Sequence, residues 1–369
     1  MPQTALVIGG TGPTGPCVIE GLRQRGYRVS ILHRGVHEVE LPAEVEHIHA
    51  DPHFTANLTE ALAGRTFDLT VSMYGRLRHT AQVMRGRTER FIGVGGVAVY
   101  LGWVDLSHHP GDALPLPIPE DALLVTDPTQ HKFTYLMVKS EEEVMEGHRQ
   151  GAYNGTVLRY PIIYGPRQLV PREWSIIRRV LDGRKHFILP EGGLYLETRG
   201  YADNMAHALL LCVDQPDRAG GQIYNVGDDR MCSLREWVEM VCAILGHRFE
   251  MVTIPLEAAF PARVYTAVLW EGQPYHRVTD ISKIKRELGY RDPVPVEEAL
   301  RRTVRWHVDH RYEPGGEIEK LLGDPFDYEA EDRLIRAYRD SVKHLSRLPG
   351  TRPEWSHPYP HPKEPHQGS

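Results

Sequence analysis

The chain has 369 residues, of which 41% are hydrophobic and 25% are charged, and its formal net charge is −6. This balance is typical of a folded globular protein, the acidic charge disfavours nucleic acid as a partner, and no apolar run approaches the roughly 20 residues that a membrane span needs. Because the N-terminus shows no signal peptide, we expect a cytoplasmic protein.

Residues 1–165 alternate short apolar runs with amphipathic stretches. The runs ALVIGG, RVSILHR, VEHIHA, FDLTVSMYG, RFIGVGG and GTVLRYP are each closed by glycine, proline or charge, as strands buried on both faces are. Helical patterns lie between them, for example at residues 17–25, 56–62 and 135–149. This order predicts an α/β fold, a Rossmann-type doubly wound parallel sheet that binds ligands at the carboxyl ends of its strands.

The first apolar run leads directly into the glycine-rich stretch GGTGPTG, which opens the first predicted helix. Bare backbone at a helix N-terminus approaches a pyrophosphate closely, so this turn predicts a dinucleotide site rather than a simple tight turn. The predicted cofactor-binding residues of this turn are Gly9, Thr11, Gly12, Pro13, Thr14 and Gly15.

The second predicted strand, SILHRG, ends in His33 and Arg34 and has no carboxylate. An acidic residue there would accept hydrogen bonds from the adenosine ribose, whereas arginine favours a 2′-phosphate. We therefore expect NADP rather than NAD, although Arg34 also fits a solvated charge at the start of a loop. Asp51 is expected either to bind the adenine amino group or to cap the next helix, and Pro52, which follows it, is a further predicted cofactor-binding residue.

The stretch TYLMVK places Tyr135 and Lys139 four residues apart within a predicted helix. At this spacing the two side chains share one face of the helix. A lysine charge beside a phenol favours the phenolate. In an arbitrary helix, however, such a pair is more often a half-buried aromatic ring beside a solvated charge.

After Pro166 the pattern changes to longer helices with short strands between them. We expect a smaller α/β substrate lobe at residues 166–308, in which Ser233 and Glu236 form a capping box at the start of a helix. Residues 309–369 form a C-terminal extension that ends in a flexible tail rich in proline and histidine.

The spacing of the cysteines and histidines does not indicate a metal site. Cys17, Cys212, Cys232 and Cys242 lack the CxxC spacing of zinc sites and disulfide frameworks, so we expect reduced core residues. Metal binding by the histidines of the tail is a less favoured alternative.

With these motifs in place, the chain resembles the extended short-chain dehydrogenase/reductases, the NAD(P)-dependent epimerase/dehydratase family, from about residue 4 to residue 308. The matching segments, in chain order, are GGTGPTG, FDLTVSMYG, VAVYLG, PIPED, the Tyr135 and Lys139 pair, LRYPIIYGPR, YADNMAHAL, YNVGDDRMCSLREW and DISKIKRELGYRDPVPVEEALRRTVRW. The resemblance implies that Met73, Tyr74 and Gly75 line the dinucleotide, and that Tyr160, Pro161, Ile162 and Ile163 pack near the nicotinamide.

The resemblance also implies a chemistry for the tyrosine and lysine pair. Tyr135 would be the general acid/base at a carbonyl or hydroxyl carbon, and Lys139 would lower its pKa and hold the nicotinamide ribose. The nicotinamide would carry the hydride. Both residues are therefore expected to be catalytic and to contact the cofactor.

One position departs from the family pattern. The family has serine or threonine, which bonds the reacting oxygen, where this chain has Gly96. Losing one donor to a developing oxyanion typically costs about 10²–10³ in rate. Thr134 and Ser72 are candidates to replace the hydroxyl, and we expect Gly96, Val97 and Thr134 to line the substrate site.

This sequence has only part of the residue set with which family members bind a nucleotide diphosphate. Family members that act on nucleotide-linked sugars use an asparagine, which YPIIYG lacks, and arginines of the second lobe, for which Arg199 is the candidate. We therefore expect an NADP(H)-dependent oxidoreductase of another small-molecule carbonyl or alcohol. The alternatives are a nucleotide-sugar epimerase or dehydratase with a recycled cofactor, and a non-catalytic dinucleotide-dependent regulatory or RNA-binding protein.

Relatives often dimerise through the helix that carries the tyrosine and lysine motif. We therefore expect a homodimer, to which Val138, Val144 and Met145 would contribute, although core packing explains these three residues equally well.

Overall fold

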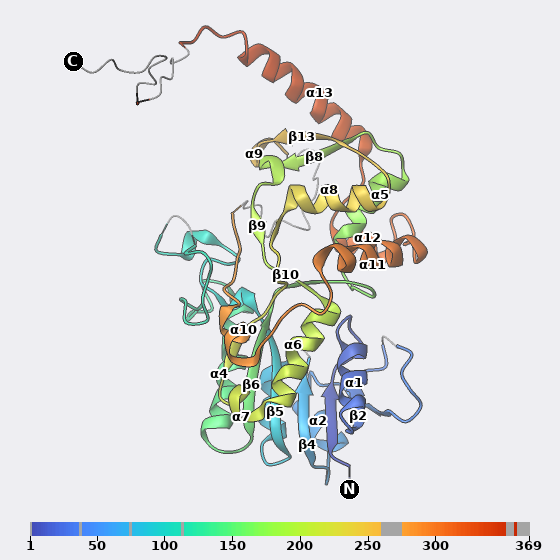
Figure 1. Ribbon diagram of the computed structural model, residues 1–369, viewed down its shortest axis with the longest axis vertical. Helices are drawn as coiled ribbons and strands as arrows, with labels where there is room; N and C mark the ends of the chain where they lie inside the picture. The colour runs from blue at the N-terminus through green and yellow to red at the C-terminus, as the bar shows by residue number, and fades with distance from the viewer. Residues whose placement is uncertain are drawn as a thin grey trace, which may run out of the picture.

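The computed structural model describes residues 2–36, 39–73, 76–111, 114–259, 275–351 and 358–359. A large sheet with its covering helices forms the lower half of the molecule in Figure 1, and a second lobe lies above it. Within the described residues, no helix combines the length and the apolar character needed to cross a lipid bilayer.

The large sheet has seven strands in the order β11-β6-β5-β4-β1-β2-β3, and all neighbouring strands are parallel. This confirms the predicted doubly wound parallel sheet. The chain order of the strands reverses between β1 and β4, and ligands of such sheets bind outside the carboxyl ends at that point. The strands are β1 (Thr4–Ile8), β2 (Arg28–His33), β3 (Glu46–His49), β4 (Phe67–Ser72), β5 (Thr88–Gly96), β6 (Asn154–Tyr160) and β11 (Ile223–Asn225).

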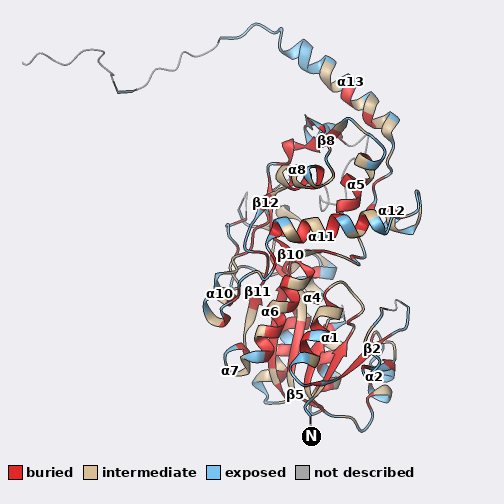
Figure 2. Cartoon of the chain, turned by 45° about the vertical axis from the view of Figure 1, so that its right-hand side comes forward, coloured by how far each residue is buried: buried red, intermediate tan, exposed pale blue. Residues whose placement is uncertain are grey.

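Helices cover both faces of this sheet, which explains why its strands are apolar runs rather than alternating patterns. Successive residues of a strand point to opposite faces. Ala5 and Val7 of β1 therefore pack with α1 (Gly15–Gln24) and α6 (Ala202–Asp214). Leu6 and Ile8 pack on the other side with α2 (Thr55–Ala61), α3 (Leu77–Met84) and α4 (Lys132–Arg149). Figure 2 shows the buried strands between these helices.

Segments beyond residue 165 return to the sheet. β11 pairs with β6 at its edge, and α10 (Ser282–Leu288) contributes to the same core as α6. Cys17 of α1 donates its thiol hydrogen to Asp203 of α6 across 3.0 Å, and burial raises the pKa of this thiol to about 12. The four cysteines are free in the structure. Short α7 (Pro216–Ala219) follows α6.

The second lobe is built from helices around three pairs of short strands. Its core joins α5 (Glu173–Leu181), α8 (Leu234–Ile244) and α11 (Val296–Asp309) through buried side chains such as Trp174 and Trp237. The strand pairs are β7 (Ile162–Tyr164) with β10 (Arg199–Tyr201), β8 (His186–Pro190) with β13 (Glu250–Ile254), and β9 (Leu196–Glu197) with β12 (Cys232–Ser233), and α9 (Leu256–Ala259) follows β13.

The capping box predicted for α8 is half formed. The hydroxyl of Ser233 accepts a hydrogen bond from the backbone N–H of Glu236 at 3.2 Å, as predicted. The carboxylate of Glu236 pairs instead with Arg230.

The first part of the C-terminal extension is an integral part of the second lobe. It forms α12 (Glu317–Leu322) and α13 (Tyr328–Leu345), and Leu322 and Ile335 are buried in the core of the lobe. Arg179 of α5 is buried and pairs with Asp324 and Glu331, each at 2.6 Å. The far end of α13 extends away from the lobe (Figure 1). The tail predicted to be flexible lies almost entirely outside the described residues.

We expect Arg179→Ala to lower the free energy of unfolding by about 3–5 kcal/mol, because it removes the nearest counter-ion of two buried carboxylates and leaves Glu331 only the longer contact with Arg184 at 3.5 Å. Denaturant titration measures this change. The matched control is Arg333→Ala, because Arg333 is exposed on α13 and pairs only loosely with Glu329 at 3.6 Å; its effect should stay within about 0.5 kcal/mol. Equal losses in the two variants would contradict a role for the buried network.

Candidate active site

A glycine-rich turn joins β1 to α1 at the point where the strand order reverses. Gly9 and Gly10 have φ angles of 93° and 84°, in the left-handed region that favours glycine. A Cβ on Gly15 would lie 2.0 Å from the carbonyl oxygen of Gly10, so the helix can approach the turn this closely only without a side chain. A Cβ on Gly12 would meet nothing within 4 Å.

The N-terminus of α1 is suited to an anion. Thr14 occupies the N-cap position, but no side chain caps the helix. The N-terminus of a helix carries a partial positive charge, although in α1 Pro16 has no N–H and the N–H of Gly15 already donates to the carbonyl of Gly12 at 3.1 Å. Together with the open space at Gly12, this arrangement fits a pyrophosphate.

A cavity of about 240 Å³ opens beside the turn. It is bounded by the carboxyl ends of β1, β2 and β4, and Leu169 of the second lobe contributes to its wall. Its lining includes seven of the predicted cofactor residues, which are Gly9, Thr11, Gly12, His33, Arg34, Pro52 and Met73. The structure thus brings together residues from four separate segments, as a dinucleotide site requires. Tyr74 and Gly75, predicted to continue this wall, lie outside the described residues.

The residues expected near the adenosine differ in their surroundings. Arg34 is exposed at the cavity. Asp51 accepts a hydrogen bond from the backbone N–H of His53 at 3.0 Å, and this bond is the main cause that lowers the pKa of Asp51. The other carboxylate contact is with the ring of His53 at 2.7 Å. Asp51 therefore stabilises the turn ahead of α2, but the N-cap position of that helix is Phe54 and no side chain caps it, so the predicted cap is not formed.

Tyr135 and Lys139 lie in the first half of α4, whose N-terminus is capped by His131. Both side chains are half-buried, and the Lys139 ammonium lies 5.4 Å from the centroid of the Tyr135 ring. The predicted sharing of one helix face is therefore confirmed. Lys139 also pairs with Glu142 at 2.6 Å, and this bond raises the pKa of Lys139. The lysine thus keeps its positive charge beside the phenol.

Gly96 ends β5, and the short 3₁₀-helix η1 (Val97–Val99) follows it. A Cβ on Gly96 would lie 2.9 Å from the terminal methyl of Met137, two residues after Tyr135. The methionine therefore borders the position at which the family's serine or threonine side chain would begin. Val97 is buried in the same apolar cluster as Val138 of α4. Nothing in the sequence indicated that Met137 lies here, because its approach depends on how α4 packs against β5.

The two candidate substitutes for the missing hydroxyl are engaged elsewhere. Thr134 is buried, and its hydroxyl lies 2.7 Å from the Nδ1 atom of His131 within the helix cap. Ser72 is also buried, and its hydroxyl lies 2.8 Å from that of Thr80. Each would have to break a bond before it could hold a substrate oxygen, so the geometry favours neither.

The segment after β6 contributes backbone and aliphatic groups. The hydroxyl of Tyr160 donates to the carbonyl of Met205 in α6 at 2.9 Å, so its side chain is directed into the core. Pro161 is buried, whereas Ile162 and Ile163 are half-buried at the start of β7. Of this predicted group, the two isoleucines are the ones with side chains open to a ligand.

The structure does not favour the predicted phosphate contact of Arg199. This guanidinium is buried in the second lobe, where it pairs with Glu197 at 3.0 Å and lies 4.7 Å from the ring of Trp237. A buried charge needs such a partner, because an unpaired charge in the interior is strongly destabilising.

The predicted dimer contacts need a similar correction. Val138 and Val144 are buried within the chain itself, in the clusters that hold α4 against η1 and the sheet. Met145 is half-buried against the second of these clusters. Core packing therefore accounts for the two valines, and neither offers its side chain to a second subunit.

Comparison with known proteins agrees with this geometry. The model of the NAD dependent epimerase/dehydratase family matches residues 5–227. Over 170 residues the chain is 28% identical to the uncharacterized protein y4nL of Sinorhizobium fredii, covering 41% of this chain and 47% of that protein. Over 185 residues it is 25% identical to the UDP-N-acetyl-alpha-D-glucosaminuronate decarboxylase of Bacillus cytotoxicus, covering 47% and 53%. The chain thus spans about half the length of these curated relatives.

Solved structures share the fold. The UDP-glucuronic acid 4-epimerase of Bacillus cereus, in complex with UDP-glucuronic acid and NAD, superposes with a TM-score of 0.64 and 17% identity, covering 84% of this chain and 100% of that chain. At this identity the likeness concerns the fold alone.

Two glycine variants separate folding from ligand binding at the turn. We expect Gly15→Ala to lower both the melting temperature and the affinity for NADPH, because its Cβ would collide with the Gly10 carbonyl. Gly12→Ala should leave the melting temperature unchanged, since it meets no protein atom. It should nevertheless weaken NADPH binding by about tenfold or more, because the new methyl occupies ligand space. Fluorescence titration and thermal unfolding measure the two effects, and undiminished binding by Gly12→Ala would argue against this cavity as the cofactor site.

Proposed function

The chain belongs to the NAD dependent epimerase/dehydratase family, and we propose that it is an NADP(H)-dependent oxidoreductase acting at a carbonyl or hydroxyl carbon. One observation carries the proposal: a phenol and a charged ammonium share one face of α4, 5.4 Å apart from ring centroid to nitrogen. The uncapped N-terminus of α1 and the cavity beside it fit the dinucleotide that such a reaction needs.

Tyr135 is the proposed general acid/base. Its hydroxyl would give a proton to the substrate oxygen in reduction, and take it back in oxidation. Lys139, which Glu142 holds in its charged form, would contact the nicotinamide ribose. The bound cofactor would supply the hydride.

NADP is the proposed cofactor. β2 ends without a carboxylate, and the exposed Arg34 lines the cavity next to it. An arginine binds a 2′-phosphate with two parallel hydrogen bonds, whereas a carboxylate at this position would repel it. NAD is the alternative, since the B. cereus epimerase was solved with NAD.

The surroundings of Gly96 bear on the substrate. The terminal methyl of Met137 borders the position at which the family's hydroxyl-bearing side chain would begin. An apolar group there lowers the local polarity, so we propose a substrate that is less polar at this point than a nucleotide-linked sugar. The buried ion pair of Arg199 agrees with this choice, because that arginine is not placed to hold a diphosphate.

A nucleotide-sugar epimerase or dehydratase, with a recycled cofactor, is the second candidate. It is favoured by the decarboxylase and epimerase relatives, whose names refer to UDP-linked sugars. The two candidates differ in net redox change, because recycling returns the nicotinamide to its starting state.

Tyr135→Phe tests the proposed acid/base. We expect it to slow hydride transfer by about 100-fold or more, since proton transfer by a positioned side chain typically contributes 10²–10⁴-fold. Nicotinamide absorbance in single turnovers, with a panel of aldehydes and ketones, measures the rate. NADPH affinity should stay within about twofold, because only a hydroxyl is removed. Tyr338→Phe, on α13, is the matched control and should retain the rate. Full activity of the Tyr135 variant would remove the tyrosine from the mechanism.

Arg34→Glu tests the cofactor preference. A carboxylate at the end of β2 should weaken NADPH binding by about tenfold or more, while NADH binding is kept or improved, because only NADPH carries the repelled 2′-phosphate. Arg28→Glu is the control, since Arg28 is exposed at the opposite end of the same strand. Equal weakening of both dinucleotides by Arg34→Glu would contradict a contact with the 2′-phosphate.

A further inference from the structure

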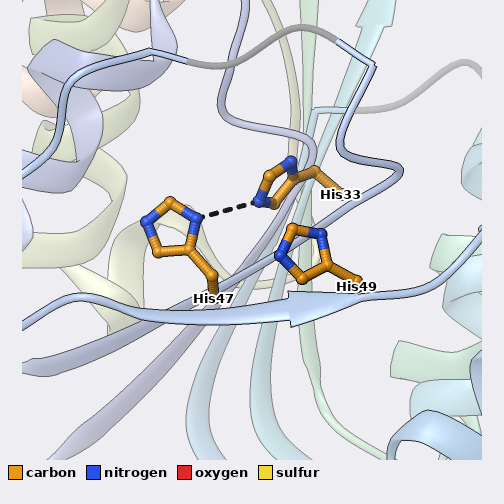
Figure 3. A group of neighbouring side chains, drawn as sticks. All are labelled: His33, His47 and His49. Carbon is orange, nitrogen blue, oxygen red and sulfur yellow. Dashed lines mark hydrogen bonds between the residues drawn. The ribbon is translucent and has the colours of Figure 1, made fainter.

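Three histidines gather at the outer edge of the sheet, where β2 and β3 end. The two strands are parallel, and their register places His33 beside His49. His47 precedes His49 by two residues, so both side chains project from the same face of β3. Figure 3 shows the three imidazole rings clustered on this face.

The ring nitrogens lie close enough for a shared ligand. One nitrogen from each ring can be chosen so that all three lie within 4.8 Å of one another. The Nε2 atom of His33 is 3.0 Å from the Nδ1 atom of His47, and the rings of His33 and His49 are 4.8 Å apart between centroids. No other group of three metal-ligating side chains occurs in the described part of the chain.

We infer that His33, His47 and His49 bind a divalent transition metal ion of the kind that prefers imidazole, with zinc as the expected ion. Three histidines with water in the fourth position are a known ligand set of zinc, with Zn–N bonds of about 2.0–2.1 Å. Imidazole nitrogen also suits copper and nickel, whereas magnesium and calcium prefer oxygen. The absence of a carboxylate or thiolate from the cluster therefore selects the class of ion.

The burial of the three residues fits a site in which one histidine is fixed and the other two side chains turn towards the bound ion. His33 is buried, which holds its ring in place, while His47 and His49 are exposed. A tetrahedral site requires nitrogens about 3.3 Å apart, so the widest separation must shorten by roughly 1.5 Å. The two exposed side chains can turn by this amount without disturbing the core, and solvent has direct access for the ion and its water ligand.

Binding also requires a change in ring protonation. In the metal-free protein, the backbone N–H of Gly35 lies 3.2 Å from Nδ1 of His33, which directs the ring proton to Nε2 and towards His47. A metal ion bound at Nε2 would shift this proton to Nδ1, so the imidazole remains neutral. The long contact with Gly35 is lost in exchange for a metal–nitrogen bond.

The test is a zinc titration of the full chain, without dinucleotide, against a competing chromophoric chelator. All samples carry asparagine in place of His357, His361 and His366, so that the tail histidines do not contribute. We expect the parent to bind one equivalent, and His47→Ala and His49→Ala to weaken binding by about tenfold or more, since even the loss of an outer partner of a ligand typically costs 10–100-fold. His344→Ala, on the exposed end of α13, is the control and should bind as the parent does.

A zinc-soaked crystal adds a second readout, in which an anomalous scattering peak should appear between the three rings. Equal zinc binding by the parent and by both β3 variants, or a peak elsewhere only, would overturn the site. The test needs no cofactor and no substrate, so its failure would leave the proposed oxidoreductase standing, and failure of that function would leave the metal site standing.

Discussion

The close approach of Gly15 to the carbonyl of Gly10 is the constraint on which the rest of the structure depends. A side chain at this position would lie 2.0 Å from a backbone oxygen, so the turn from β1 into α1 is possible only with glycine. That turn lies where the strand order reverses. It leaves the N-terminus of α1 uncapped and opens a cavity at the ends of β2 and β4. The apolar strands fix the sheet, and the glycine determines that its central crevice stays open to a ligand.

In the proposed function the reacting side chains lie on a different element, α4, which packs against β5 and β6. The helix presents Tyr135 and Lys139 on one face and directs Met137 towards Gly96 on another. In the proposed mechanism the lysine charge lies beside the phenol, while the Gly96 position offers no side-chain hydroxyl to the reacting oxygen. In this proposal Tyr135 is the side chain that gives the proton, and the methyl of Met137 places an apolar group beside Gly96.

Local patterns predicted the fold well, because apolar runs, glycines and the four-residue spacing of Tyr135 and Lys139 act over short stretches. Features that depend on packing between distant segments could not be predicted in this way. Arg199 looked available for a phosphate; its partner Glu197 is only two residues away, but the burial of the pair depends on the distant helix α8, whose Trp237 ring lies 4.7 Å from the guanidinium. Arg179 forms ion pairs with two carboxylates of the C-terminal extension, and more than a hundred residues of sequence separate it from each of them. Only part of the histidine cluster is visible in the sequence. His47 and His49 are two residues apart and so share one face of a strand, but His33 is brought beside them by the register of β2 and β3.

A crystal structure with NADP bound tests the central claim most directly, since it measures where the nicotinamide lies relative to Tyr135. We expect the pyrophosphate over Gly12 at the N-terminus of α1, and the tyrosine hydroxyl and lysine ammonium both facing the nicotinamide ribose, within about 3.2 Å or one water of their partners. A nicotinamide bound away from α4, or a hydroxyl turned out of the occupied crevice, would contradict it.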